Sequence, residues 1–294
     1  MVLVVGATGL VGSEVCQKLA RKGETVRALV RSTSSKEKVE TLRSGGVEIC
    51  VGDLKDPDSI RAACRGVDAV ISTASSTLSR QAGDSIESVD AAGQMNLVNA
   101  AKAANVGRFV YLSFRSPDAS SPLSDAKRRV ETAIASMNFT VIQASWFMEV
   151  WLSPALGFDY ANATARIYGP GTSLISWVSY RDVAEMCSLV LRHSAAERQT
   201  IEFGGPEALS PLEVVARFEK IAGRRFILDH VPERTLRTQF EEATDSMQKS
   251  FAALMLGYLN GDAMDKAPIV DQLGLKLTSV EEYARRVLGN AAGA

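Results

Sequence analysis

Three glycines near the N-terminus have the spacing of an anion-binding turn. Gly6, Gly9 and Gly12 follow the apolar run 2–5 and lead into an amphipathic segment, 10–22. Gly6 permits a tight turn, Gly9 lets the backbone approach phosphates, and Gly12 allows close helix–strand packing. Free N–H groups and the dipole at the start of the helix favour an anion. We predict that Gly6, Thr8, Gly9, Leu10, Val11 and Gly12 bind a dinucleotide pyrophosphate; the alternative is a tight turn without a ligand.

The end of the second apolar run, 25–30, predicts which dinucleotide binds. An NAD site commonly has Asp or Glu here to accept the ribose hydroxyls. This chain has Arg31, followed by four Ser and Thr residues and Lys36. A guanidinium suits a 2′-phosphate, so NADP(H) is expected in preference to NAD(H). The alternatives are a solvated charge for Arg31 and, for Arg27, either a similar phosphate contact or an exposed strand residue.

Two later loops carry further candidate contacts for the dinucleotide. Asp53 follows the third apolar run and could accept from the adenine amino group while Leu54 packs on the ring. The alternative for Asp53 is that it caps the following turn. Ser72, Thr73 and Ala74 follow the fourth run; their small side chains would admit the cofactor, or they form only a polar turn.

The composition predicts an ordinary globular protein. Of the 294 residues 46% are hydrophobic and 23% charged, and the net charge of −1 gives no argument for nucleic acid or an acidic membrane. No apolar run approaches the ~18 residues of a membrane span, and no signal peptide precedes the first strand. Four scattered cysteines read as buried free thiols, and two distant histidines make a metal site unexpected. We therefore expect a cytoplasmic location.

Apolar runs alternate with helical patterns in the first half, which predicts an α/β fold with a Rossmann-type, doubly wound parallel sheet. Strands are expected at 2–5, 25–30, 47–51, 68–72, 108–113, 139–144, 199–203 and 225–229; helices are expected at 10–22, 35–44, 57–65, 84–104, 122–137, 181–193 and 210–222. The predicted domains are an NAD(P)-binding Rossmann domain, 1–150, and a smaller mixed C-terminal substrate lobe, 151–294, from which about 175–205 return to the first domain.

Several residues are expected to begin or end helices. Asp56 before Pro57 and Ser210 before Pro211 have the pattern of an N-cap followed by proline in the first turn. Asp182 is expected to cap a helix that begins at Val183. His193 is read as a charge that complements the end of a helix.

The proton-donating Tyr-x-x-x-Lys motif of ordinary short-chain dehydrogenases is missing. None of the six tyrosines has Lys four residues later, and Leu123 stands four residues before Lys127. The chain nevertheless resembles the NmrA-like family of atypical short-chain dehydrogenases, which includes quinone reductases, isoflavone reductase-like proteins and non-catalytic redox sensors. The resemblance rests on the segments 6–9, 26–31, 52–54, 127–131, 146–149, 180–184 and 203–210.

The resemblance implies the catalytic candidates. The lysine that matches Lys127 lies beside the nicotinamide and ribose in isoflavone reductase-like proteins, so Lys127 is expected to hold the cofactor or to act as acid or base. The alternative is a surface lysine that pairs with Glu131. Ser113 ends the fifth predicted strand, where the superfamily's catalytic serine commonly lies; otherwise it only terminates the strand.

Apolar residues near the predicted carboxyl edge of the sheet are candidates for substrate contact. They are Phe114, Trp146, Phe147, Met148, Tyr168 and Trp177. Open α/β folds bind ligands at this edge, and these side chains suit an aromatic or quinone-like compound. For residues 146–148 the alternative is core packing between the lobes.

Two functions are consistent with these features. The first is an NADPH-dependent oxidoreductase that transfers hydride to a quinone, enone or other apolar conjugated substrate. The alternative is a non-enzymatic NADP(H)-binding redox sensor or assembly factor that acts through a protein partner. A homodimer is compatible with either.

Overall fold

The computed structural model describes residues 1–79, 81–115 and 120–291 of the chain. The chain divides into two compact units. Unit 1 consists of Met1–Phe114, Pro122–Gln143 and Val183–Ile201, and unit 2, in its described residues, of Arg115–Ser121, Ala144–Asp182 and Glu202–Ala294. The boundary predicted near residue 150, with a later segment returning, stays a prediction.

A seven-stranded sheet forms the centre of the Rossmann-type fold. Its order is β3-β2-β1-β4-β5-β6-β9. The first five strands in this order, β3, β2, β1, β4 and β5, are each parallel to their neighbours. The strands are β1 (Val2–Val5), β2 (Val26–Val30), β3 (Glu48–Val51), β4 (Ala69–Ser72), β5 (Arg108–Phe114), β6 (Phe139–Ala144) and β9 (Gln199–Phe203). Strands β1 and β4 are buried throughout, as central strands covered on both faces require.

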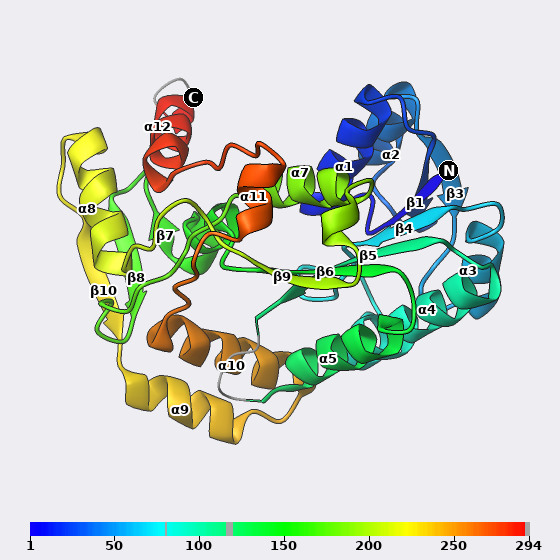
Figure 1. Ribbon diagram of the computed structural model, residues 1–294. Helices are drawn as coiled ribbons and strands as arrows, with labels where there is room; N and C mark the ends of the chain where they lie inside the picture. The colour runs from blue at the N-terminus through cyan, green and yellow to red at the C-terminus, as the bar shows by residue number, and fades with distance from the viewer. Residues whose placement is uncertain (80, 116–119, 292–294) are drawn as a thin grey trace. The chain divides into compact units, whose positions relative to one another are not determined.

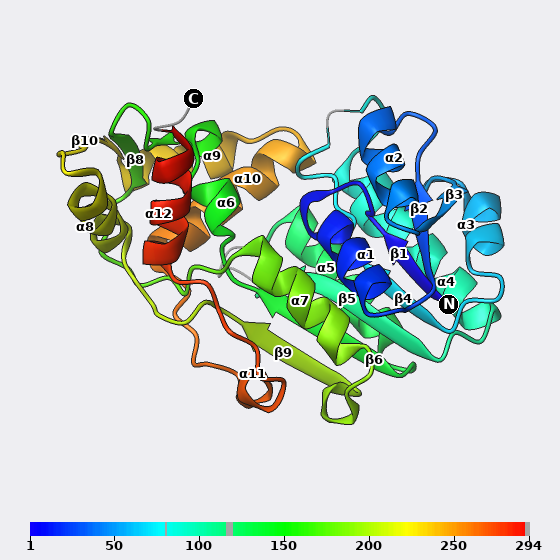
Figure 2. The same cartoon turned by 90° about the horizontal axis from the view of Figure 1, so that it is seen from above.

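Helices connect the parallel strands and cover both faces of the sheet. They are α1 (Leu10–Arg21), α2 (Lys36–Ser44), α3 (Pro57–Ala63), the π-helix η1 (Ile86–Gly93), α4 (Gln94–Ala103), α5 (Pro122–Ile134) and α7 (Tyr180–Val190), followed by the 3-10 turn η3 (Ser194–Ala196). Figures 1 and 2 show α1 and α2 on one face and α3, α4 and α5 on the other. Glu185 fastens α7 to α1, because both Lys18 and Lys22 donate to its carboxylate at 2.8 Å. The doubly wound architecture expected from the sequence is confirmed.

Unit 2 contains a small mixed sheet and most of the C-terminal helices. Its sheet has the order β10-β8-β7, with β10 parallel and β7 antiparallel to β8. The elements are α6 (Met148–Trp151), η2 (Pro154–Leu156), β7 (Phe158–Asp159), β8 (Thr164–Tyr168), α8 (Pro211–Ala222), β10 (Ile227–Val231), α9 (Glu233–Glu242), α10 (Ser246–Asn260), α11 (Pro268–Gln272) and α12 (Val280–Ala291). Its own hydrophobic core includes Trp177, Phe218 and Tyr283.

The helix signals in the sequence were mostly correct. Asp56 caps α3 before Pro57, and Ser210 forms a capping box with Glu213 before α8. Asp182 was wrong as an N-cap, because α7 begins at Tyr180 and the Asp182 carboxylate accepts instead from Thr278, at 2.6 Å from its backbone nitrogen. His193 was also wrong as a helix-end charge: α7 ends at Val190 and His193 has extended backbone before η3.

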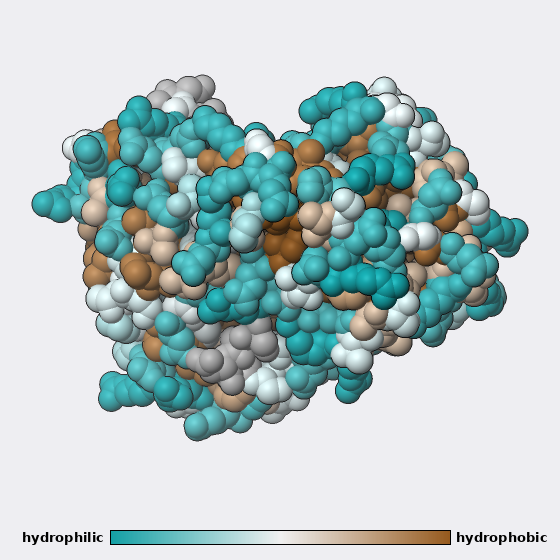
Figure 3. Space-filling view, in the orientation of Figure 1, coloured by the Kyte–Doolittle hydropathy of each residue, from teal (hydrophilic) through white to brown (hydrophobic). Residues whose placement is uncertain are grey.

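Side chains at the surface are mainly hydrophilic on the face drawn in Figure 3. Among the described residues, no helix is long and apolar enough to cross a membrane.

The cysteines are free thiols. Cys16, Cys64 and Cys187 are buried, as expected, and Cys50 is half-buried. Burial raises the pKa of Cys16 and of Cys187 to about 12, which keeps these thiols protonated and unreactive.

The turn after β1 is packed too closely for any side chain at two of its glycines. Gly6 has φ +85°, and a Cβ there would lie 2.8 Å from the backbone nitrogen of Ala74 and from the Thr73 hydroxyl. A Cβ on Gly12 would lie 2.2 Å from the Gly6 carbonyl oxygen. Helix α1 therefore touches the turn through backbone alone, which fixes where α1 begins relative to β1 and β4.

Gly12→Ala is expected to lower the free energy of unfolding by roughly 2–4 kcal/mol, because backbone must move to admit the methyl group. Denaturant unfolding followed by circular dichroism measures this change. Gly289→Ala is the matched control: it lies in α12 with no atom within 4 Å of the added Cβ and should be neutral or stabilising. Equal stability of the two variants would contradict the close approach at Gly12.

Candidate functional site

The start of α1 is open to a ligand. Gly9 is the N-cap residue, no side chain caps the helix, and its first turn has no acidic residue. Gly9 is exposed, and a Cβ there would meet only the Gly6 carbonyl oxygen, at 3.2 Å. Uncapped N–H groups at the positive end of the helix dipole suit an anion. These residues fit a pyrophosphate, and the contacts predicted for residues 6 and 8–12 stay a prediction.

Lys38 adds a positive charge to the same turn. Its Nζ donates to the carbonyl oxygen of Thr8 at 3.2 Å. The sequence analysis named Lys36 and missed Lys38, although Ser35 at the start of α2 is a signal for it: the Ser35 hydroxyl caps the backbone nitrogen of Lys38 and so places this residue in the first turn.

Arg31 lies directly after β2, and its guanidinium is partly exposed at 31%. One of its terminal nitrogens pairs with the carboxylate of Asp84, which the sequence analysis did not single out. Arg31 is thus neither a free surface charge nor wholly available to a phosphate. Arg27 donates to the Ala63 carbonyl oxygen at 2.9 Å and pairs with Glu48, so it is not an exposed strand residue; a phosphate contact by Arg27 stays a prediction.

Asp84 is the centre of a buried ionic cluster. Its side chain is only 2% exposed and accepts hydrogen bonds from Arg31, from Ser79 and, at 2.5 Å, from Lys55. Burial disfavours its charged form, but the hydrogen bonds from Lys55, Ser79 and Arg31 outweigh burial and hold the pKa of this carboxyl below its ordinary value. Asp84 is therefore a permanent negative charge beside Arg31 at neutral pH.

The loop after β3 shows the turn-capping geometry. The Asp53 carboxylate accepts from the backbone nitrogen of Lys55 at 2.8 Å and pairs with the Lys55 ammonium at 3.0 Å. Asp53 stays one-third exposed, so a contact with adenine stays a prediction. Leu54 is buried in the core of unit 1, and packing of its side chain on the adenine ring stays a prediction.

The loop after β4 divides into an inward and an outward part. The Ser72 side chain is fully buried and donates to Gln94 at 2.9 Å, so its hydroxyl has a partner within the fold, and its contact with the cofactor stays a prediction. Thr73 donates to the Val5 carbonyl oxygen at 3.1 Å, and Ala74 lies against the turn at Gly6. Thr73 and Ala74 are half-buried beside the start of α1, and their contact with the cofactor stays a prediction.

Lys127 is buried and is not the surface lysine of the alternative interpretation. Its side chain, on α5, is 7% exposed. Its Nζ donates to the Leu112 carbonyl oxygen at 3.3 Å, lies 5.0 Å from the centre of the Tyr111 ring and 3.9 Å from Asp90 Oδ1. Burial lowers the pKa of Lys127, while the charges of Asp90 and Glu131 act in the opposite direction. An ammonium of this kind is poised to release a proton more readily than a surface lysine.

Asp90 is the charged partner of Lys127, and the sequence analysis missed it. It lies on the π-helix η1 and is fully buried; its Oδ2 accepts from the Ser76 backbone nitrogen at 2.9 Å and from the Ser76 hydroxyl at 2.6 Å. Its Oδ1, which faces Lys127, and the Tyr111 hydroxyl have no hydrogen-bond partner within the described part of the chain. Buried polar atoms are normally paired, and π-helices are frequent at functional sites.

Ser113 and Phe114 are the last two residues of β5. They follow Leu112, whose carbonyl oxygen accepts from Lys127 Nζ. The Ser113 hydroxyl accepts from Arg128 at 3.0 Å, and Arg128 also donates to the Phe114 carbonyl oxygen. Arg128, not Lys127, pairs with Glu131, at 2.9 Å. The Lys127–Glu131 pair of the alternative interpretation is thus replaced, because the lysine side chain enters the core while Arg128 stays on the rim of α5. The roles of Ser113 and Phe114 toward a substrate stay predictions.

Unit 2 contains the other aromatic candidates. Trp146 and Trp151 pack edge to face with ring centroids 4.4 Å apart, and Tyr258 stacks on Trp151 at 5.5 Å. Met148 and Trp177 are completely buried in the core of unit 2, and the Trp177 indole donates to the Leu209 carbonyl oxygen at 2.8 Å. Core packing, the alternative for residue 148, describes the surroundings of both side chains. Substrate contact by Trp146, Phe147, Met148, Tyr168 and Trp177 stays a prediction.

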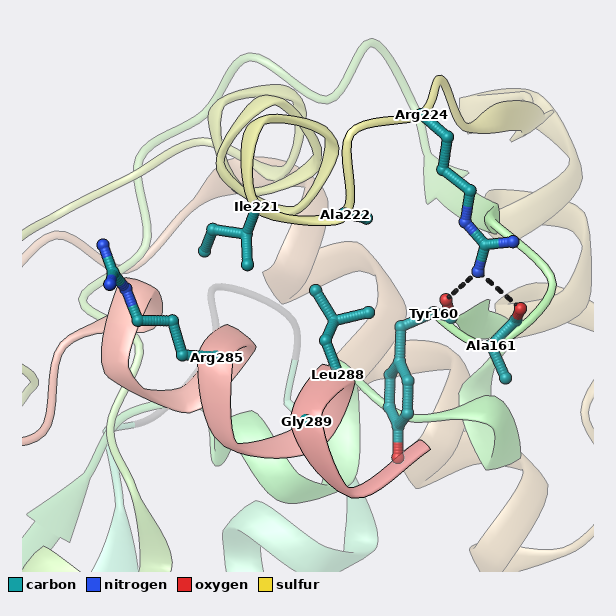
Figure 4. A pocket seen from close by; sticks show the side chains of 8 residues that line it. All are labelled: Tyr160, Ala161, Ile221, Ala222, Arg224, Arg285, Leu288 and Gly289. Atoms are coloured by element: carbon teal, nitrogen blue, oxygen red, sulfur yellow. Dashed lines mark hydrogen bonds between the residues drawn. The ribbon is translucent and has the colours of Figure 1, made fainter. Parts of the chain in front are cut away.

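A shallow hollow of about 500 Å³ lies between α8 and α12 within unit 2 (Figure 4). Ile221 and Leu288 face each other across it, and Arg224 at its edge donates to the carbonyl oxygens of Tyr160 and Ala161. Arg285 is paired with Glu281. No predicted site residue lines this hollow.

Among the described residues no cluster of three His, Cys, Asp or Glu side chains is placed to hold a metal ion.

The strand order and the glycine turn define a Rossmann-type α/β protein with a small second unit. Within this class the chain belongs to the NmrA-like family, whose model matches residues 1–284. It is similar to the photosystem II assembly factor Ycf39 of Synechocystis sp., with 29% identity over 98% of this chain and 90% of that protein. An NAD(P)H azoreductase of Xenophilus azovorans is 31% identical over 97% of each chain.

Solved structures show the same fold. The NADPH-dependent quinone oxidoreductase QOR2 of Escherichia coli, complexed with NADPH, superposes with a TM-score of 0.78 at 22% identity, over 98% of this chain and all of that one. A triphenylmethane reductase of Citrobacter sp. superposes with a TM-score of 0.77 at 21% identity, over 97% of this chain and 99% of that one. At these identities the likeness is one of fold.

Asp90→Asn is expected to lower the pKa of Lys127 further, because it removes the largest charge that stabilises the buried ammonium. Nuclear magnetic resonance of lysine labelled at the side chain measures this pKa without any ligand. Glu131→Gln removes a smaller stabilising charge and is the matched control, which should lower the pKa less. An unchanged Lys127 pKa in Asp90→Asn would contradict the assigned pairing.

Proposed function

We propose that this protein is an NADPH-dependent reductase that transfers hydride to a quinone, an enone or another apolar conjugated acceptor. The observation that carries the proposal is the buried ammonium of Lys127, enclosed beside the end of β5 in the same unit as the open glycine turn. Such a group is a proton donor kept away from bulk water. The similarity of the chain to an NAD(P)H azoreductase, and of its fold to a quinone and a triphenylmethane reductase, gives the proposal further support.

Under this proposal, different residues of the chain bind the cofactor and transfer the proton. The uncapped start of α1 holds the pyrophosphate, Lys38 adds positive charge there, and Arg31 binds the 2′-phosphate. The nicotinamide supplies the hydride. Lys127 Nζ polarises the acceptor oxygen or nitrogen and gives it a proton, and Ser113 at the end of β5 orients that atom. No tyrosine is required, because a reduced quinone can also take its proton from solvent.

A protein-assembly or sensor role is the second candidate. The observation that favours it is the similarity to Ycf39 over nearly the whole chain. Under this function the protein binds NADP(H) and uses its surface to engage a partner protein, and Lys127 only holds the cofactor. The two functions differ in one measurable respect, which is turnover of reduced cofactor by acceptors.

Purified protein with NADPH and a panel of quinones, enones and azo dyes is expected to oxidise NADPH, because the chain offers both a dinucleotide turn and an enclosed proton donor. Loss of reduced-nicotinamide absorbance measures this. Tight NADPH binding without turnover of any acceptor would contradict the reductase and favour the second candidate.

Lys127→Ala is expected to reduce kcat by about 100-fold or more, the usual effect of losing a positioned proton donor. Steady-state kinetics with the best acceptor measure it. Lys102→Ala, an exposed lysine at the end of α4, is the control and should be as active as the wild type. A fully active Lys127→Ala would exclude the assigned role.

Arg31→Ala is expected to weaken NADPH binding by about 10–100-fold, because a charge-assisted hydrogen bond to the 2′-phosphate is lost. Binding of NADH should change little. Fluorescence titration of the two reduced cofactors measures both constants. Equal losses for NADPH and NADH would show that Arg31 does not contact the 2′-phosphate.

A further inference from the structure

The carboxylate that is missing after β2 is supplied by another part of the chain. Directly after β2 stands Arg31, and no acidic residue follows in 32–36. Asp84, at the end of the loop between β4 and η1, lies against the Arg31 guanidinium in the folded chain. The usual position of an NAD-selective carboxylate is thus occupied by a cation, with an anion beside it that is distant in sequence.

Several contacts hold Asp84 in this place. Lys55, which follows β3, donates to its Oδ1 at 2.5 Å, and Ser79 donates to its Oδ2. Thr33 and Gln81 join the same two loops through a hydrogen bond of 2.5 Å. Asp84 also precedes Ser85, whose capping box with Ser88 begins η1. The carboxylate is therefore fixed by its surroundings and cannot simply turn away from Arg31.

The position of Asp84 has opposite consequences for the two dinucleotides. A 2′-phosphate that binds the exposed side of Arg31 meets the negative charge of Asp84 within the same cluster, and repulsion weakens it. A ribose 2′-hydroxyl carries no charge, so the Asp84 carboxylate does not repel NADH in this way. Asp84 therefore opposes the selectivity that Arg31 alone would confer.

We infer that Asp84 is a specificity-determining residue that reduces, without removing, the preference of the site for NADPH over NADH. The inference rests on the proposed function only in requiring that a dinucleotide binds; it does not require turnover. Arg31 attracts the 2′-phosphate, Asp84 offsets part of that attraction, and the balance of the two sets the ratio of the dissociation constants.

Fluorescence or calorimetric titration of the wild type with NADPH and NADH tests the inference directly. NADPH is expected to bind more tightly than NADH by no more than about 10-fold, since the charge of Asp84 offsets part of the attraction of Arg31 for the 2′-phosphate. A preference for NADPH above about 100-fold would overturn the inference. If neither dinucleotide binds, the proposed function fails as well, and this result is distinct from binding with strong selectivity.

Asp84→Asn keeps a hydrogen-bond acceptor for Lys55 and Ser79 and removes the charge. It is expected to tighten NADPH binding about 10-fold and to leave NADH binding equal or weaker, because a repulsive charge beside the phosphate is lost. Asp84→Ser serves the same purpose if thermal melting shows that the asparagine variant does not fold. Asp84→Glu retains the charge and should keep the wild-type ratio.

Glu40→Gln is the matched control, because it removes one negative charge from an exposed residue of α2 that is paired with Arg43. It should change both dissociation constants by less than about twofold, as expected for an exposed, solvent-screened charge. If Asp84→Asn and Asp84→Ser fold and leave the NADPH-to-NADH ratio unchanged, or weaken NADPH selectively, the inference is wrong.

Discussion

The backbone contact between the turn after β1 and the start of α1 is the constraint on which the rest of unit 1 depends. The Gly6 carbonyl oxygen occupies the space where a side chain on Gly12 would stand, and the loop after β4 closes the other side through Ala74 and Thr73. Because this contact leaves no room for a Cβ, it fixes α1 at the carboxyl edge of the sheet. The uncapped N–H groups of α1 consequently face the same edge as the loops that follow β2, β3 and β4.

The loop between β4 and η1 links the two ends of the candidate site. At its end Asp84 lies against Arg31, and six positions later along the chain Asp90 faces Lys127 from the π-helix. Neighbouring residues of one segment therefore supply the anion to both candidate cations of unit 1. Both anions are buried, so each has more effect on its partner than a surface carboxylate would.

The polar groups buried around Lys127 lower the free energy of unfolding relative to an apolar core in the same place. A buried ammonium is disfavoured by desolvation, and Asp90 opposes this while leaving its own Oδ1 and the Tyr111 hydroxyl without a hydrogen-bond partner in the described structure. Apolar side chains of similar volume would avoid such a cost. The proposed proton transfer by Lys127 would give this buried cluster a function. Arg128 differs from Lys127 in that its contacts with Ser113 and Glu131 lie at the rim of α5.

The sequence by itself determined the order of strands and helices in unit 1, the caps at Asp56 and Ser210, and the glycine turn, because these follow from local periodicity and from steric limits of single residues. The tertiary structure alone decided what each charge faces. Asp84 and Asp90 carry no local signal; they acquire partners because parallel strands bring separate loops to one edge of the sheet. Burial likewise assigned Leu54, Ser72, Met148 and Trp177 to the interior, since their surroundings come from distant parts of the chain.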